Sequence, residues 1–427
     1  MRILYVVPYT PNLIRVRPFN LIRHLAQRGH QIILLTLYQS EAEQAEARGL
    51  EAYCHQVIAL PLSRWRSLWN CLATVPRKEP LQTAYCWQPA LSRQLQEMVW
   101  GPSGRSPFDI IHIEHLRGVR YGLHLQANQN GFGSHPPIVW DSVDCISHLF
   151  RQAAAGSQNQ WGRWMTRFDV ERTERFESQL LHRFSQVLVT SPLDKKAFLS
   201  LSSNSGQDAS ISVLPNGVDL AYFQPDATMR REEATLVVSG KMSYHANITM
   251  TLHLMQNIMP HVWAKCPDVK LQIVGKDPSR DIQAFNEHPN VTVTGTVADI
   301  RPYLQRATVA VAPITYGAGI QNKVLEAMAC ATPVVTSPQA VSALTAVPDR
   351  DLLVADDAET FAQTILYLLE NPNRREAIGT AGRAYIETQH NWANVAGQLE
   401  EVYLGIISNS PSKLEKGRAK VMFNHNR

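Results

Sequence analysis

Residues 316–335 read YGAGIQNKVLEAMACATPVV and place a glycine-rich turn, a helix and a strand in succession. Gly317 and Gly319 predict the turn, the apolar run after them predicts the helix, and Pro-Val-Val predicts the strand. This succession is typical of the parallel sheets of α/β proteins. Lys323 and Glu326 fall in the first two turns of the otherwise apolar helix, where a charge requires an explanation.

The N-terminus of a helix attracts anions, because its first N–H groups lack partners and the helix dipole is positive there. A bound anion would offset the unfavourable position of Lys323, and Glu326 on the same face suits hydrogen bonds to sugar hydroxyls. The alternative is a surface Lys–Glu pair, but the apolar neighbours predict a buried helix. We therefore interpret the segment as a nucleotide site, with phosphate at Lys323 and ribose at Glu326.

Apolar strands alternate with helical segments along the rest of the chain, in two series. Fully apolar strands separated by helices predict parallel sheets covered on both faces. The sequence therefore predicts an α/β fold with two Rossmann-like, doubly wound domains that face a central cleft, where such sheets bind ligands. The strands of the first series are RILYVV, QIILLTL, FDIIHIE, PIVWD and SQVLVTS, and those of the second are TLVVSG, VKLQIVG, VTVTG, VAVAPI and TPVVTS.

The length of 427 residues exceeds one ordinary core and also predicts two domains. No stretch of 18 apolar residues occurs, and the opening MRILYVV predicts a strand rather than a signal peptide. Six cysteines without a C-x-x-C pair predict reduced thiols and a cytoplasmic protein. The net charge of +4 is too small to indicate nucleic acid as a partner.

A second candidate anion site is SGKMSYHANI, residues 239–248, after the first strand of the second domain. Gly240 ends the strand, Lys241 follows at its tip, and Asn247 is placed to cap the next helix. The alternative is a solvated loop lysine, which the presence of the first anion-binding segment makes less favoured.

Polar residues end the strand FDIIHIEHLRG in the first domain. Strand alternation places His112 and Glu114 on one face, and the carboxyl end of a parallel strand faces the ligand cleft. We expect these two residues in the cleft and keep His115 as a further candidate. The alternative for each is a polar residue satisfied at a strand end.

Arg15 and Arg17 stand just before the first helix, and arginine suits bidentate contact with phosphate. We expect them to hold a donor or acceptor phosphate, the alternative being two solvated loop arginines. Asp141 ends the strand PIVWD, where it binds acceptor hydroxyls or caps the next helix. The D-x-D pair Asp349 and Asp351 lies in a turn, and we predict no metal site there.

Three segments, LPNGVD, VTVTGTVADIRPYLQRATVAVAPI and KVLEAMACATPVV, resemble the retaining glycosyltransferases of family 4, which have the GT-B fold. The resemblance covers nearly the whole chain. It implies an acceptor-binding domain over residues 1–215 and a nucleotide-sugar domain over residues 216–390. It also implies a helix over residues 391–407 that crosses back to the first domain, before a polar tail over residues 408–427 that we expect to be disordered.

The resemblance implies a nucleotide-sugar donor in the second domain, an acceptor in the first, and no metal or other cofactor. The family signature is a Glu, seven residues and a second Glu; Glu326 matches the second, whereas Ala318 occupies the first, which contacts the transferring sugar in the family. The implied donor-binding residues are Gly240, Lys241, Gly317, Gly319, Ile320, Asn322, Lys323 and Glu326, and the implied catalytic region, often His-x-His in the family, falls on His112, Glu114 and His115.

These observations predict an enzyme that transfers a hexose from a UDP- or GDP-linked sugar to a glycan or lipid-linked acceptor, with retention, in polysaccharide or glycolipid biosynthesis. Lys323, Lys241 and the helix N-terminus would stabilise the leaving phosphate. Ala318 leaves open a non-catalytic nucleotide-sugar-binding protein of the same fold. An NAD-dependent dehydrogenase is disfavoured because the chain has no G-x-G-x-x-G.

Tryptophan and arginine are interleaved in residues 61–78 and 161–184 of the first domain. Helices with Trp65, Trp69 and neighbouring arginines suit the headgroup region of a membrane. We expect peripheral contact with the inner face of the plasma membrane. The alternative is that these tryptophans pack in the core of the first domain.

Overall fold

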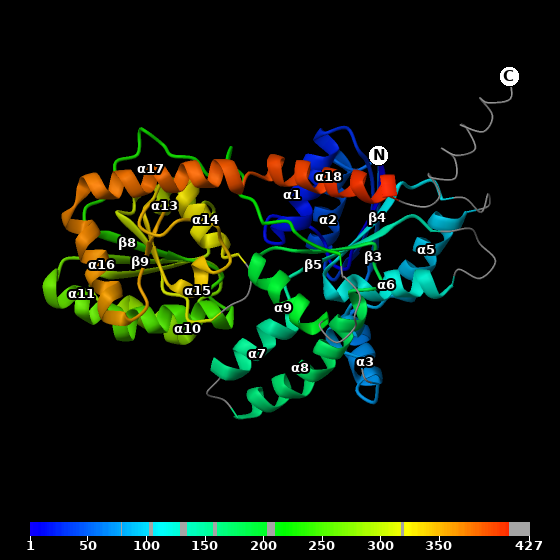
Figure 1. The fold of residues 1–427 in the computed structure, drawn as a ribbon. Helices are drawn as coiled ribbons and strands as arrows, with labels where there is room; N and C mark the ends of the chain where they lie inside the picture. The colour runs from blue at the N-terminus through cyan, green and yellow to red at the C-terminus, as the bar shows by residue number, and fades with distance from the viewer. Residues whose placement is uncertain are drawn as a thin grey trace, which may run out of the picture. The chain divides into compact units, whose positions relative to one another are not determined.

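The computed structural model of the chain describes residues 1–77, 79–101, 106–128, 135–156, 160–202, 210–316 and 320–409, without the side chains of residues 153–168. It divides into two compact units (Figure 1): unit 1 comprises Met1–Leu214 and Val395–Arg427, and unit 2 comprises Pro215–Asn394. Each unit contains one parallel sheet with flanking helices, which confirms the predicted α/β class. The tail predicted to be disordered lies outside the described residues from residue 410 onward.

Unit 1 contains a seven-stranded parallel sheet in the order β3-β2-β1-β4-β5-β6-β7. The chain leaves β1 toward β2 on one side and later returns through β4 on the other, so the strand order switches direction between β1 and β4. In doubly wound sheets the carboxyl ends of the strands at this point bind ligands. The strands are β1 Arg2–Val7, β2 Gln31–Tyr38, β3 Gln56–Pro61, β4 Ile110–Glu114, β5 Ile138–Val143, β6 Gln186–Val189 and β7 Ile211–Val213.

Helices cover both faces of this sheet because alternate strand residues point to opposite sides. One face carries Tyr5 and His112 and lies against α1 and α18, whereas the other carries Leu4, Ile111 and Trp140 in a core with α5, α6, α8 and α9. The helices are α1 Val16–Gln27, α2 Glu41–Gly49, α3 Arg64–Thr74, α4 Leu81–Tyr85, α5 Pro89–Trp100, α6 His115–Ala127, α7 Ile146–Gly156, α8 Gln160–Leu180, α9 Pro192–Ser202 and α18 Trp392–Asn409.

Unit 2 contains a six-stranded parallel sheet in the order β10-β9-β8-β11-β12-β13, which switches direction between β8 and β11. In unit 2, α11 packs on α16 and α14 packs on α17 around the sheet (Figure 1). The strands are β8 Thr235–Ser239, β9 Lys270–Val274, β10 Val291–Gly295, β11 Val309–Ala312, β12 Val334–Thr336 and β13 Leu353–Val354, and the helices are α10 His245–His253, α11 Met259–Lys265, α12 Arg280–Ala284, α13 Arg301–Arg306, α14 Asn322–Ala329, α15 Pro338–Val341, α16 Ala358–Glu370 and α17 Pro372–Gln389.

The last helix, α18, is tied to the sheet side of unit 1 by specific polar contacts. Glu400 accepts a hydrogen bond from Nε of Arg28 at 2.6 Å and lies 3.0 Å from Nε2 of His30. One turn further, the hydroxyl of Tyr403 lies 2.7 Å from Nδ1 of His112 in β4. These contacts attach the described residues from Val395 to Asn409 to unit 1.

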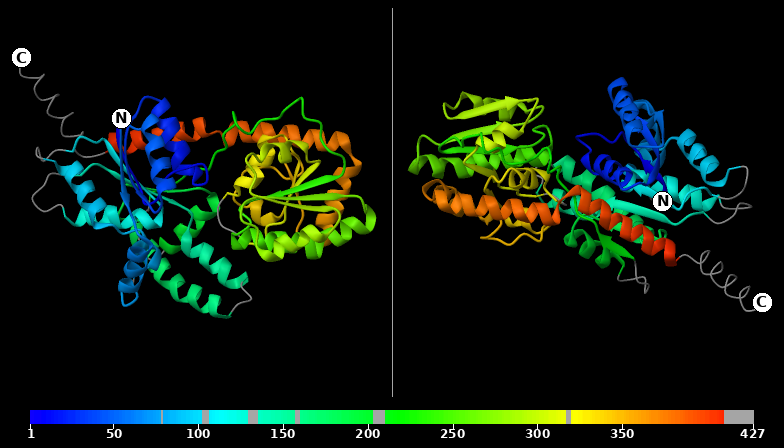
Figure 2. Two further views of the ribbon diagram at one scale, coloured as in Figure 1. Left: turned by 180° about the vertical axis from the view of Figure 1, so that it is seen from behind. Right: turned by 90° about the horizontal axis from the view of Figure 1, so that it is seen from above.

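Helix α3 leaves a large apolar surface exposed. Trp65 is 75% exposed and Trp69 is 69% exposed, and Leu68, Leu72 and Val75 beside them are also exposed. The alternative that these two tryptophans pack in a core is therefore wrong, whereas the side chains of Trp161 and Trp164 lie outside the described residues. In Figure 1 and in the left view of Figure 2, α3, α7 and α8 extend from the same side of the unit 1 sheet.

No described helix combines the length and apolar character needed to cross a membrane.

Candidate functional site

The two predicted anion-binding segments meet at the switch point of unit 2. Gly240 and Lys241 follow β8, and the chain after the neighbouring strand β11 leads through Tyr316 to α14. The described residues bring Gly240 close to Lys323, since a Cβ added to the glycine would lie 3.4 Å from Cε of the lysine. Gly317, Ala318 and Gly319 lie outside the described residues.

Asn247 connects these segments. Its Nδ2 donates to the carbonyl oxygen of Lys241 at 3.0 Å, and its Oδ1 accepts from Nζ of Lys323 at 2.9 Å. A side chain on Gly240, whose φ is 150°, would collide with this amide, because its Cβ would lie 2.7 Å from Nδ2. The predicted capping role of Asn247 is wrong, since Tyr244 is the N-cap of α10. Its amide instead holds Lys323 against the loop after β8.

Lys323 is a half-buried ammonium held by neutral partners. Besides Asn247, its Nζ donates to Oε1 of Gln321 at 3.3 Å, and it forms no salt bridge with the described residues. Burial lowers the pKa of Lys323 to about 8, against the opposing effect of Glu326. An ammonium with amide oxygens but no carboxylate partner gains most from a bound anion.

Glu326 lies one turn along α14 and is also half-buried. Burial raises its pKa to about 7, although the nearby Lys323 ammonium acts in the opposite direction. Among the described residues, no side chain or backbone group donates a hydrogen bond to this carboxylate. Its free oxygens can therefore accept hydrogen bonds from hydroxyl groups of a ligand.

The start of α14 offers further polar groups. The N-cap residue Gln321 makes no side-chain capping bond, but its carbonyl oxygen accepts from the backbone N–H groups of Val324 and Leu325. Within the described residues, the N–H groups of Asn322 and Lys323 are therefore the ones that an anion could reach. Oδ1 of Asn322 is buried and has no hydrogen-bond partner in the described part of the chain. The structure places Ile320 in the core of unit 2, where it anchors the start of the helix rather than offering a polar group.

An aromatic pair, His245 and Tyr316, lies beside this site and was not expected from the sequence. The rings of His245 and Tyr316 are stacked with centroids 5.6 Å apart, and Nδ1 of His245 lies 2.7 Å from the tyrosine hydroxyl. Their only sequence signal is position, because each follows a strand at the switch point. The pair connects the loop after β8 with the segment that leads to α14, while Lys241 beside it is exposed.

In unit 1 the structure places His112 away from solvent, contrary to the expectation that it faces a cleft. Its ring is 0% exposed, stacks on Tyr5 with centroids 4.1 Å apart, and lies beside the hydroxyl of Tyr403. Burial lowers the pKa of His112 to about 4, so the imidazole is neutral near pH 7. The covering residue comes from α18, which is distant in sequence, and strand alternation gives no sign of it.

Glu114 is buried beside His112, and only His115 reaches the surface at this strand end. Glu114 accepts a hydrogen bond from the hydroxyl of Tyr9 at 3.0 Å, and burial, followed by the charge of Asp141, raises its pKa to about 8. His115 is partly exposed with a left-handed φ of 62°, and its Nδ1 accepts from the backbone N–H of Arg117 at 3.3 Å. Because Nδ1 accepts, a neutral His115 carries its proton on Nε2 and can donate it to a ligand.

The two arginines have protein partners. Arg17 is 4% exposed and forms a bidentate pair with Asp141, with Nε–Oδ2 and Nη2–Oδ1 distances of 2.9 and 3.2 Å. Arg15 pairs with Glu43 at 3.2 Å and lies over the ring of Tyr9. The expected phosphate and acceptor roles of Arg17 and Asp141 are not supported by this geometry, because each group satisfies the other.

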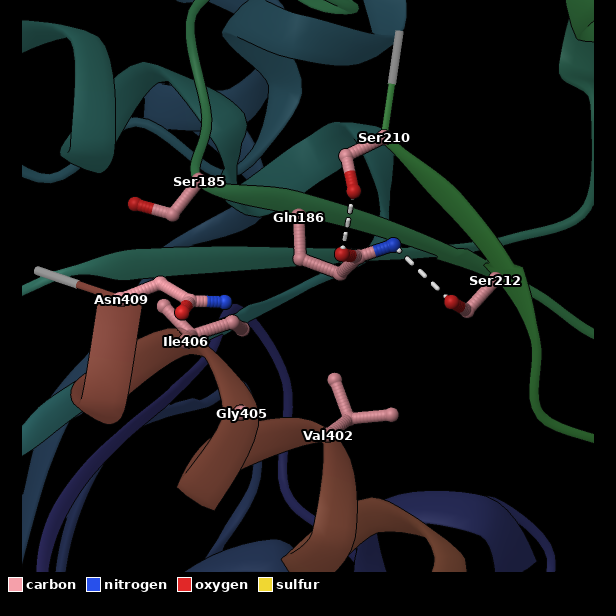
Figure 3. A pocket seen from close by; sticks show the side chains of 8 residues that line it. All are labelled: Ser185, Gln186, Ser210, Ser212, Val402, Gly405, Ile406 and Asn409. Carbon is pink, nitrogen blue, oxygen red and sulfur yellow. Dashed lines mark hydrogen bonds between the residues drawn. The ribbon is translucent and has the colours of Figure 1, made fainter.

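A cavity of about 450 Å³ lies in unit 1 between the start of β6, the start of β7 and α18 (Figure 3). Its described walls carry hydroxyl, amide and aliphatic groups but no ionised side chain. The amide of Gln186 is already bonded to Ser210 and Ser212, at 2.6 and 3.1 Å. The cavity adjoins the amino ends of these strands, so it is separate from the candidate site.

The remaining carboxylate pair does not resemble a metal site. Oδ1 and Oδ2 of Asp351 accept from Nε and Nη2 of Arg350, at 2.8 and 2.9 Å, and Oδ2 also accepts from the backbone N–H of Val347. Asp349 has a left-handed φ of 61° in the same turn. The described residues contain no group of three or more His, Cys, Asp or Glu side chains arranged to hold a metal ion.

Comparison with family models identifies the chain. Residues 14–217 match the glycosyl transferase 4-like domain, and residues 233–371 match glycosyl transferases group 1. The chain is a group 1, family 4-like glycosyltransferase. The second match contains Lys241, Lys323 and Glu326, so the candidate site of unit 2 belongs to the family domain.

Part of this glycosyltransferase is also similar in sequence to individual glycosyltransferases. It is 28% identical over 225 residues to a GDP-mannose-dependent monoacylated alpha-(1-6)-phosphatidylinositol monomannoside mannosyltransferase from Corynebacterium glutamicum. That match covers 46% of the chain and 57% of the relative, so the chain spans about half the length of the curated relatives that it matches.

Solved structures show the fold. Sucrose-phosphate synthase from Thermosynechococcus elongatus superposes with a TM-score of 0.66 at 18% identity, covering 96% of this chain and 100% of that one. HepE from Anabaena in complex with UDP-glucose has a TM-score of 0.65 at 14% identity, covering 95% and 100%. The glycosyltransferase therefore has the predicted GT-B architecture of two Rossmann-like domains.

Proposed function

We propose that the protein transfers a hexose from a UDP- or GDP-linked sugar to a glycan or lipid-linked acceptor, with retention of configuration. The observation that carries the proposal is Lys323, a desolvated ammonium at the start of α14 with neutral oxygen partners. The donor diphosphate supplies the missing negative charge. Lys323 and the N–H groups of α14 then stabilise the leaving phosphate as negative charge develops on it.

The remaining donor contacts follow from the order of groups along α14. Glu326 lies one turn from Lys323, so a diphosphate at the lysine places the ribose within reach of the carboxylate. Lys241, exposed on the neighbouring loop, adds a second cation near the phosphates. The relatives support both kinds of donor, because one is GDP-mannose-dependent and HepE was solved with UDP-glucose.

On the acceptor side we assign the ligand contact to His115. It is the partly exposed residue at the end of β4, and its Nε2–H donates to a sugar or acceptor hydroxyl. The strand-end residues His112 and Glu114 are buried, so they support the end of β4 instead of contacting the ligand. In the transfer, the leaving phosphate accepts the proton of the acceptor hydroxyl, so no protein nucleophile is required.

The direct test is to incubate the purified protein with a panel of UDP- and GDP-sugars and to measure release of the nucleoside diphosphate. We expect release from at least one donor, and equal rates in excess EDTA, because we propose a reaction without a bound metal. Binding without release from any donor would favour a non-catalytic sugar-binding protein. Loss of activity in EDTA that manganese restores would contradict the metal-independent reaction.

The two pKa values predict a window of donor affinity. A bound diphosphate raises the pKa of Lys323 from about 8, so its contribution is present below that pH and is lost as pH rises through it. Ribose hydroxyls lower the pKa of Glu326 from about 7, so its contribution is present above that pH and is lost as pH falls.

Calorimetry with an intact nucleotide sugar should therefore give maximal affinity between about pH 7 and pH 8, with up to about tenfold loss per pH unit on either side. The matching nucleoside, which lacks phosphate, should lose affinity only on the acid side. An equal alkaline loss for the nucleoside would contradict the assignment of phosphate to Lys323.

We also propose that α3 docks unit 1 peripherally on the cytoplasmic leaflet of the membrane, where it reaches a lipid-linked acceptor. Trp65, Trp69 and the exposed aliphatic residues beside them form an apolar face next to Arg64 and Arg66. An apolar face bordered by cations suits the boundary between headgroups and acyl chains, particularly in anionic membranes. The phosphatidylinositol-linked substrate in the name of the Corynebacterium relative supports a lipid-linked acceptor.

Flotation with liposomes tests this docking. The protein should float with vesicles that contain anionic lipid, and less of it should float at high salt. Trp65→Ser with Trp69→Ser should remain at the bottom of the gradient with an unchanged circular dichroism spectrum. As a matched control, replacing the exposed Tyr367 of unit 2 by serine should not alter flotation. If the protein does not float with anionic vesicles, the docking proposal is wrong and a soluble acceptor is favoured.

A further inference from the structure

A second cavity of unit 1, of about 240 Å³, lies between α7 and α9. Since α7 follows β5 and α9 follows β6, the cavity adjoins the carboxyl edge of the sheet, where doubly wound folds bind ligands. Its volume is below the range of about 300–1,000 Å³ that is usual for whole drug-sized ligands. The cavity therefore suits one small group of a larger molecule and not a whole nucleotide sugar.

The described lining of this cavity is basic. His148, Arg151 and Lys196 contribute basic side chains, and Ser147 and Ser200 contribute hydroxyl groups. No carboxylate is among the described lining residues. The cavity of Figure 3, in the same unit, has no charged group in its described lining, so the basic character is particular to this one.

The acidic residues near the cavity are engaged elsewhere. Glu177 accepts hydrogen bonds from the first backbone N–H groups of α7, from Ile146 at 3.0 Å and from Ser147 at 3.2 Å. Asp194 accepts from the backbone N–H of Cys145 at 3.0 Å. Both carboxylates therefore hold the start of α7 in place, and Asp194 also lies close enough to His148 for their charges to interact.

One of the basic groups has an acidic partner, and two do not contact a carboxylate in the described structure. Nε of Arg151 lies 2.5 Å from Oε1 of Glu174, which fixes the guanidinium at the rim. His148 contacts the amide of Gln152 at 2.8 Å, and Lys196 is exposed. Basic side chains and hydroxyls in a lining that itself has no carboxylate have the chemistry of a phosphate site, even though Arg151 also pairs with Glu174 outside the lining.

We propose that this cavity binds a phosphate group carried by the acceptor, an inference that rests on the proposed function. The donor diphosphate has its own site at Lys323 in unit 2, so the cavity in unit 1 serves the other substrate. The acceptor is therefore anionic, either a lipid phosphate or a phosphorylated sugar. Helices α3, α7 and α8 extend from the same side of the sheet (Figure 1), and Nη2 of Arg172 in α8 donates to the carbonyl oxygen of Val75 after α3, so the cavity and the tryptophan face belong to one end of unit 1.

The test uses the full chain with Lys323→Ala, which weakens phosphate binding in unit 2, and reads binding at the cavity itself. Two probes are titrated separately: glucose 6-phosphate, and dihexanoyl phosphatidic acid below its micelle concentration. The ring resonances of His148, assigned with His148→Gln, report binding at the cavity. We expect Lys196→Ala to weaken the binding of at least one probe by about tenfold, as loss of a charged hydrogen bond does.

Lys195→Ala is the matched control, because it removes the same charge from α9 at a position that does not line the cavity. It should change affinity less than about twofold, because its ammonium does not line the cavity and acts on a bound phosphate only through a screened charge. A response to phosphatidic acid alone supports a lipid-linked acceptor, and a response to glucose 6-phosphate supports a phosphorylated sugar. Resonances of His148 that move with neither probe, or equal losses in the two lysine variants, would overturn the proposal.

Failure here is distinguishable from failure of the proposed function. The parent protein could release nucleoside diphosphate from a sugar donor while the resonances of His148 respond to neither phosphate probe. That result would indicate a transferase with an uncharged acceptor, and it would overturn only the present inference. A protein that releases nothing from any donor contradicts the transferase proposal, whatever His148 shows.

Discussion

Lys323→Ala should weaken binding of UDP or GDP by about 2 kcal/mol, a roughly 30-fold rise in Kd, because it removes a charged hydrogen bond to the diphosphate. The parent lysine is well placed for this contact. Asn247 and Gln321 hold its ammonium with neutral oxygens, and burial lowers its pKa to about 8. The variant also removes a desolvated charge, so we expect the free protein to be no less stable.

Calorimetry with the nucleoside and with its diphosphate separates the roles on α14. Lys323→Ala should spare uridine or guanosine, whereas Glu326→Gln should weaken nucleoside and nucleotide alike, because the ribose is common to both. Lys241→Ala is the matched control for charge, since it removes a neighbouring exposed ammonium and should cost less. Equal losses of nucleoside and diphosphate on Lys323→Ala would refute the phosphate contact.

The fold and the position of the Lys323 helix could be predicted because their signals are local. Apolar strands such as β1 and β8 are buried on both faces, so they appear in the sequence as unbroken apolar runs. The helix that contains Lys323 could be recognised because its charged and apolar residues all lie within one segment of eight residues. The switch point then follows from strand order, which the succession of strands and helices strongly restricts.

The polar residues of unit 1 were harder to interpret, because their partners are far away in the sequence. His112 contacts Tyr403, which is 291 residues later, and Arg17 pairs with Asp141 across 124 residues. A polar residue at a strand end has the same local pattern whether it faces a ligand or another buried side chain. The packing of α1 and α18 on that face of the sheet determines whether such a residue faces a ligand or a buried side chain.

The same distinction between ligand contact and buried pairing can be measured at Arg17. Arg17→Ala should lower the free energy of unfolding by about 3–5 kcal/mol, because it leaves the carboxylate of Asp141 buried without its partner. Glu114 in the same buried cluster adds little near pH 7, because burial raises its pKa to about 8 and its carboxyl is largely neutral there. Urea unfolding followed by tryptophan fluorescence gives the value directly.

Arg17→Met combined with Asp141→Leu should recover most of this loss, because replacing both members of a buried ion pair by apolar groups is often neutral. Arg15→Ala is the matched control: its pair with Glu43 is more exposed and should contribute at most about 1 kcal/mol. If Arg17 were instead a phosphate ligand, Arg17→Ala would leave unfolding unchanged and weaken substrate binding, and the double variant would restore nothing. Recovery in the double variant would therefore assign the arginine to the architecture of unit 1, and His115 would stay the residue of this strand end that we propose to contact the substrate.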